Sequence, residues 1–64
     1  MNLCKRYVKE FATDALKAYK TADGKTTATY AIKKTVVDRY IELCEYGYIS
    51  NTEAIRKIME EVSA

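Results

Sequence analysis

The sequence predicts one small, mostly helical domain over residues 1–64, with a short strand between its first and second helices. Three observations support this fold class. Apolar residues recur at three- and four-residue spacing along most of the chain, which is the period of an amphipathic helix. Residues 26–32 are instead rich in side chains that favour extended backbone. Gly47 and the residues after it carry signals for a helix end, a turn and a new helix.

The N-terminal unit, residues 1–22, is expected to hold an amphipathic helix over 2–21. Asn2 is a candidate N-cap, because its side chain can accept a hydrogen bond from a free amide of the first turn. An Asp-Gly turn at 22–25 ends the helix. The expected buried face consists of Cys4, Tyr7, Val8, Phe11, Ala12, Ala15, Leu16 and Tyr19.

Residues 26–32 favour a strand. Three threonines, one tyrosine and one isoleucine stand here, and β-branched and aromatic side chains suit a pleated surface. Alternate residues of a strand point to opposite sides. One side would carry Ala28, Tyr30 and Ile32, and the other Thr27, Thr29 and Ala31.

The same segment allows a second interpretation. A helix could start at Thr26 or Thr27 and run unbroken to Tyr46, since alanines at 28 and 31 permit it. The chain would then be an all-α three-helix bundle. We favour the strand, which gives the order helix, strand, helix, helix, and keep the bundle as the alternative.

Helices are predicted at 34–46 and from 51 to about 63. Gly47 lies between them and has no Cβ to oppose the left-handed conformation that closes a helix. Ser50 and Glu53 have capping-box spacing, in which the hydroxyl accepts from the amide of Glu53 and the carboxylate reaches back to the amide of Ser50. The sequence therefore predicts a sharp turn followed by a well-capped last helix.

The pattern over 27–62 resembles the ribbon–helix–helix family, which includes methionine- and Arc-type repressors and many antitoxins. The resemblance is most specific at the glycine turn and the opening of the helix after it. It implies an intertwined homodimer whose paired strands form a ribbon that enters the major groove of DNA. The residues that carry it are Gly47-Tyr48 and Ser50-Asn51-Thr52-Glu53-Ala54-Ile55-Arg56.

The resemblance implies a small DNA-binding regulator, of transcriptional repressor or antitoxin type. Outward strand residues would read bases, and the start of the last helix would hold a phosphate with its free amides. The base-reading residues would be Thr27, Thr29 and Ala31, and the phosphate-binding residues Lys25, Ser50, Asn51 and Thr52. Arg56 is expected to form an ion pair on the helix surface.

The rival hypothesis is a small helical protein-binding module, such as a phage or mobile-element inhibitor of a host protein. The extra helix over 2–21 and the lack of basic residues in the proposed strand motivate it. Its binding surface would be the basic first helix or the turn at Tyr46–Tyr48.

The composition and length of the chain also indicate which cofactors, activities and partners to expect. The chain has no histidine and two cysteines, so we expect no metal or other cofactor. We also expect no catalysis. Cys4 and Cys44 are expected to be buried thiols in a reducing cytoplasm. No apolar run reaches the roughly 18–20 residues of a membrane span, so no membrane partner is expected. A 64-residue chain has a small core, which favours a homodimer.

Overall fold

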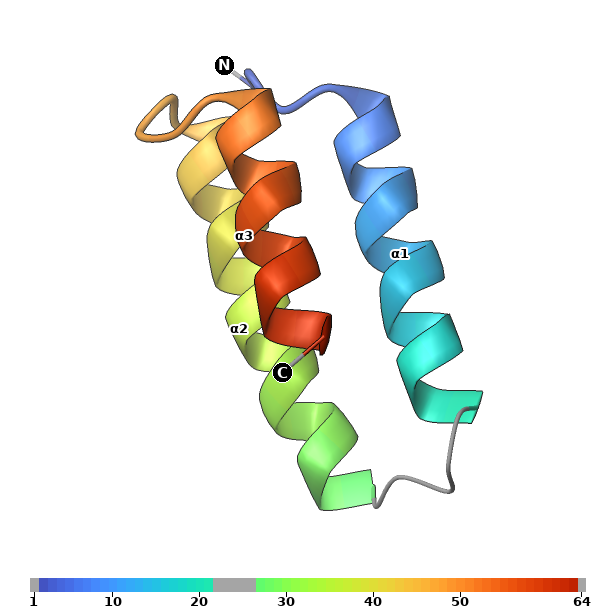
Figure 1. Ribbon diagram of the computed structural model, residues 1–64. Coiled ribbons are helices and arrows are strands. Elements are labelled where there is room, and N and C mark those ends of the chain that lie inside the picture. The colour runs from blue at the N-terminus through green and yellow to red at the C-terminus, as the bar shows by residue number, and fades with distance from the viewer. Residues whose placement is uncertain (1, 22–26, 64) are drawn as a thin grey trace.

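Three helices pack side by side in the structure, a computed structural model that describes residues 2–21 and 27–63. They are α1 (Arg6–Thr21), α2 (Thr27–Glu45) and α3 (Asn51–Ser63). Consecutive helices run in opposite directions, and every pair of helices is in contact (Figure 1). The segment before α1 therefore lies at the same end of the bundle as the turn between α2 and α3 (Figure 1).

The strand predicted at 27–32 is wrong. These residues form the first turns of α2, and the described part of the chain contains no strand. The ribbon–helix–helix fold is thereby corrected to the alternative, an all-α three-helix bundle. The start of the longer helix at Thr27 agrees with that alternative.

Packing against the other helices explains why helix wins over the extended preference of this segment. The Tyr30 side chain packs against the buried core from the second turn of α2. The Lys33 ammonium donates to the carbonyl of Glu61 at 2.7 Å, which ties this end of α2 to the last turn of α3. Strand propensity is worth little alone, and tertiary contacts of a helix override it.

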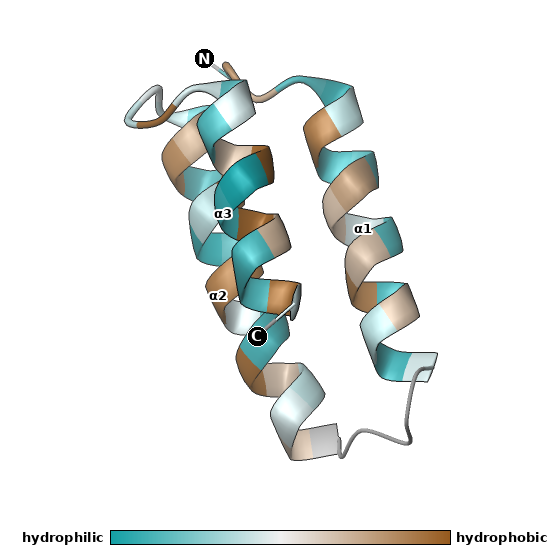
Figure 2. Ribbon diagram, viewed as in Figure 1, coloured by the Kyte–Doolittle hydropathy of each residue, from teal (hydrophilic) through white to brown (hydrophobic). Residues whose placement is uncertain are grey.

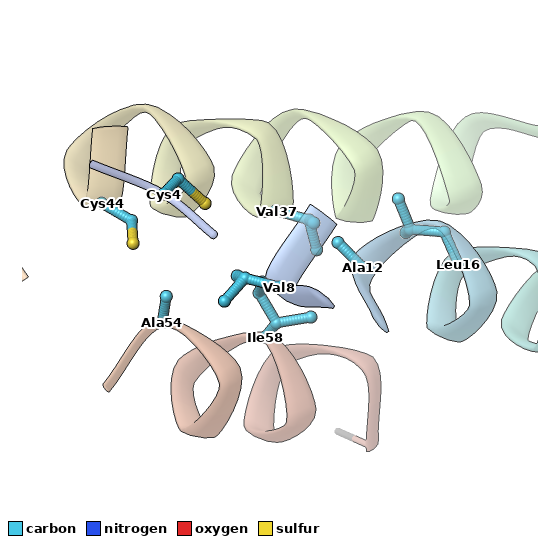
Figure 3. Packing of buried hydrophobic residues seen from close by; sticks show 8 residues of the cluster. All are labelled: Cys4, Val8, Ala12, Leu16, Val37, Cys44, Ala54 and Ile58. Atoms are coloured by element: carbon cyan, nitrogen blue, oxygen red, sulfur yellow. The ribbon is translucent and has the colours of Figure 1, made fainter. Parts of the chain in front are cut away.

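The core is a narrow column between the helices. Val8, Val37 and Ile58, one from each helix, are completely buried. Apolar and polar residues alternate along each helix at the predicted period (Figure 2). Tyr7, which the spacing assigned to the buried face of the first helix, is instead 54% exposed. The buried set is Cys4, Val8, Ala12, Leu16, Tyr19, Val37, Cys44, Ala54 and Ile58, most of which are drawn in Figure 3.

The first helix starts later than predicted. Its first residue is Arg6, and Asn2 accepts a hydrogen bond from the amide of Cys4 at 2.9 Å, in the segment before the helix. The last helix has the predicted bounds. Ser50 Oγ accepts from the amide of Glu53 at 3.0 Å, so the N-cap is confirmed.

The turn after α2 closes with a Schellman motif. The amide of Tyr48 donates to the carbonyl of Leu43 at 2.9 Å, and that of Gly47 donates to the carbonyl of Cys44 at 3.1 Å. Gly47 has a φ of +84°, as this motif requires. A Cβ added there would lie 2.7 Å from Cδ1 of Leu3. The turn therefore requires glycine for the positive φ of its backbone and for the close approach of the Leu3 side chain.

Replacing Gly47 by alanine should destabilise the chain by about 1–2 kcal/mol, because an L side chain strains the left-handed conformation and meets Leu3. Urea unfolding measures the loss. The matched control is D-alanine at the same position, introduced by chemical synthesis. D-Alanine accepts a positive φ, so that variant should be at least as stable as the natural chain. An L-alanine variant of unchanged stability would show that the turn tolerates another backbone conformation.

Candidate functional site

The side chain of Asn51 joins three segments at one end of the bundle. Its Oδ1 accepts from the amide of Lys5 at 2.8 Å and from the thiol of Cys44 at 3.4 Å. Its Nδ2 donates to the carbonyl of Leu3 at 3.4 Å. The first residue of α3 therefore fastens the segment before α1 and the end of α2 at the same point.

The N-terminal segment has further attachments to α2. The amide of Leu3 donates to the carbonyl of Glu45 at 3.1 Å. The carboxylate of Glu45 pairs with the ammonium of Lys9 at 3.0 Å, on the second turn of α1. These bonds hold the backbone of the N-terminal segment against the end of α2, next to the turn.

The fixed turn exposes an apolar and aromatic surface, which we call the tyrosine end and define as Leu3, Tyr46, Gly47 and Tyr48. Leu3 is 48% exposed, Tyr46 69% and Tyr48 76%. The two tyrosine rings lie with their centroids 6.5 Å apart and their planes tilted by 58°. Large apolar side chains are thus held in water by a turn that has little freedom to bury them.

Positive charge lies at the same end of the bundle. Lys5 and Arg6 are exposed where α1 begins, and the ion pairs found among residues 2–21 and 27–63 include neither of them. The N-termini of α1 and α3 both point to this end (Figure 1). Helix N-termini carry partial positive charge, so the surroundings of the tyrosine end favour negatively charged groups.

The residues predicted to read bases are not brought together. Thr27 is the first residue of α2, Thr29 is partly buried, and Ala31 is exposed on the same helix. Residues two apart in a helix point in nearly opposite directions, so Thr29 and Ala31 do not share a face as the strand would have required. Lys25 lies outside the described residues.

Three of the four residues predicted to hold a phosphate, Ser50, Asn51 and Thr52, do share one place, the start of α3. Ser50 caps the helix, and the Asn51 amide group is occupied within the chain, whereas Thr52 is exposed. Arg56 pairs with Glu53 and Glu60 on the surface of α3, as predicted. The observed contacts of Ser50 and Asn51 are structural.

Sequence reasoning missed Asn51 as a joining residue and Leu3 as a surface residue. Asn51 contacts residues 46 and 48 positions away, and no local pattern identifies such partners. The glycine turn flanked by two tyrosines was the one available signal, and it lies at the end of the molecule where Asn51 and Leu3 meet.

The surface also has an open groove between α1 and α2. Its volume is about 340 Å³, and Ala12, Leu16 and Val37 are among its lining residues. Ion pairs of Lys9 with Glu45 and of Lys34 with Asp38 border it. Its charged groups are already paired within the chain, so the groove has less to offer a partner than the tyrosine end.

Other classes of site find little support in the described residues. No group of three histidine, cysteine or acidic side chains in 2–21 and 27–63 could hold a metal ion. None of the described helices is long and apolar enough to span a membrane. Comparisons with protein-family models, curated proteins and solved structures gave no match to this chain.

Asn51→Ala should destabilise the chain by about 1–3 kcal/mol, because it removes three hydrogen bonds and leaves the amide of Lys5 without its acceptor. Hydrogen exchange of the Lys5 amide should accelerate in parallel with the loss seen in urea unfolding.

The matched control is Ser50→Ala, which removes the neighbouring cap at a cost of about 1 kcal/mol but leaves Asn51 in place. Because Asn51 still accepts from the Lys5 amide in this variant, hydrogen exchange of that amide should accelerate less than the loss of stability in urea would predict. Equal acceleration at Lys5 in both variants would contradict the joining role of Asn51.

Proposed function

We propose that this protein is a small protein-binding module that engages its partner through the tyrosine end. The main support is the exposure of Tyr46 and Tyr48, at 69% and 76%, on a turn held by a Schellman motif and by the Asn51 side chain. This corresponds to the protein-binding alternative considered for the sequence, with its turn as the binding surface.

The chemistry of tyrosine supports this function. A tyrosine ring supplies a large contact area with few rotatable bonds, so it loses little conformational entropy on binding, and tyrosine is enriched among residues that dominate binding energy. Exposed groups of large apolar side chains mark interaction sites on soluble proteins. A turn that is rigid before binding adds affinity because the partner does not have to order it.

The surroundings of the surface indicate the kind of partner. An apolar recess would receive the Tyr46 and Tyr48 rings and Leu3. Acidic residues around that recess would complement Lys5 and Arg6, which are exposed at the same end. Such rim charges mainly raise the association rate and set specificity, so salt should weaken binding only moderately.

DNA reading by a ribbon is not proposed, because the residues that would form the ribbon belong to α2. The homodimer expected from the small size stays a prediction, and light scattering of the purified chain tests it.

Loss of both rings should weaken partner binding. The partner is first captured in the producing cells by a photoreactive phenylalanine placed at position 48, with the same group at Ile32 as reference, and is then purified. Calorimetric titration of that protein compares the natural chain with a variant carrying Tyr46→Ser and Tyr48→Ser. We expect the dissociation constant to rise by a factor of about 10 or more.

Ile32→Ser is the matched control, because Ile32 is 64% exposed on the second turn of α2, whereas the two tyrosines follow the last residue of that helix. It should change the dissociation constant by less than a factor of about 3. Both variants should keep the melting temperature of the natural chain, since they alter exposed side chains. Equal affinity of the tyrosine variant, equal crosslinking from both positions, or capture that nuclease abolishes would contradict the proposal.

A further inference from the structure

Two buried thiols lie beside each other where the N-terminal segment meets α2. Cys4 is 7% exposed and Cys44 is 1% exposed, and both are free. Figure 3 shows them as neighbours at one end of the core. The hydrogen bond from the amide of Leu3 to the carbonyl of Glu45, at 3.1 Å, holds the adjoining backbones together.

The hydrogen bonds on either side of the two cysteines meet at one atom. The thiol of Cys44 donates to Asn51 Oδ1 at 3.4 Å, and the amide of Lys5, the residue after Cys4, donates to the same oxygen at 2.8 Å. These bonds bring together two cysteines that stand 40 positions apart in the sequence (44 minus 4). Burial, and then the neighbouring Cys44, raise the pKa of Cys4 to about 11.

We propose that Cys4 and Cys44 are a dithiol pair that closes to an intramolecular disulfide and thereby locks the N-terminal segment onto the end of α2. The disulfide would fasten the segment that carries Leu3 beside the turn that carries Tyr46 and Tyr48. This inference does not depend on the proposed function, because it concerns only the chemistry of the two thiols.

The oxidant is a small-molecule disulfide, for which glutathione disulfide is the probe. The thiolate of Cys4 attacks one sulfur of the reagent, the S–S bond of the reagent breaks, and one glutathione leaves. The thiolate of Cys44 then attacks the Cys4 sulfur and releases the second glutathione. The protein gives up two electrons and two protons, and the reagent is reduced to two glutathione thiols.

Cys4 is the better first nucleophile on structural grounds. It lies outside the helices, in the segment before α1, and is 7% exposed, whereas Cys44 belongs to α2 and is 1% exposed. A thiolate is the reactive species, and a raised pKa keeps its population small at neutral pH. Closure should therefore be slow near pH 7 and accelerate as the pH rises towards about 11.

A disulfide between these positions would close a loop of about 40 residues, and cross-links over long loops remove much conformational freedom from the unfolded chain. The oxidised protein should therefore melt on the order of 10 °C above the reduced protein. Calorimetry of the two forms measures this difference.

The test incubates the folded chain at low micromolar concentration with glutathione disulfide and follows its intact mass. We expect a loss of about 2 Da, the mass of two hydrogens, and after proteolysis one linked pair of peptides containing Cys4 and Cys44. The single variants Cys4→Ser and Cys44→Ser are the controls. Each should accumulate one bound glutathione, which the natural chain should not.

Three results would overturn the proposal. They are accumulation of glutathione on the natural chain without an internal bond, disulfide-linked dimers in its place, and closure only after the chain has been unfolded in urea. An oxidised form that melts at or below the temperature of the reduced form would refute the locking effect.

Discussion

The hydrogen bonds of the Asn51 side chain are the interaction on which this end of the molecule depends. One amide group accepts from Lys5 and Cys44 and donates to Leu3, so α3, the N-terminal segment and α2 meet at a single residue. The end of the bundle is a weak point in any small helical domain, because helix termini leave backbone groups without partners. Here the Asn51 side chain, Ser50 and the Schellman motif satisfy several of those groups.

The residues that stabilise the fold are separate from the exposed rings of the tyrosine end. The apolar core, formed around Val8, Val37 and Ile58, holds the three helices together. The rings of Tyr46 and Tyr48 contribute little to that core, since they lie mostly in water. The backbone of the tyrosine end is nevertheless fixed by the surrounding bonds. A rigid surface outside the core suits partner binding. Another molecule can bury its side chains without disturbing the core of this chain.

Part of the fold could be predicted from the sequence because its signals are local. The cap at Ser50, the glycine at 47 and the apolar period of the last helix fix the turn and α3 within a few residues. The pairing of Arg56 with Glu53 and Glu60 also follows from helical spacing.

The start of α2 could not be predicted in the same way. Threonines, Tyr30 and Ile32 favour extended backbone locally, whereas the packing of Tyr30 against the core and the bond from Lys33 to α3 favour helix. The candidate site likewise has a part with local signals in the sequence and a part without them. The turn tyrosines are visible in the sequence, whereas the contacts of Asn51 with Leu3 and Lys5 span nearly the whole chain and have no local signature.

The chain is helical throughout residues 28–32 and therefore presents a tyrosine end in place of a DNA-reading ribbon. Backbone chemical shifts of the assigned protein in solution test this helix. We expect Cα and carbonyl shifts displaced downfield, as in a helix, continuously from Ala28 through Val37. Extended shifts over 28–32, with helical shifts beginning only after them, would contradict it.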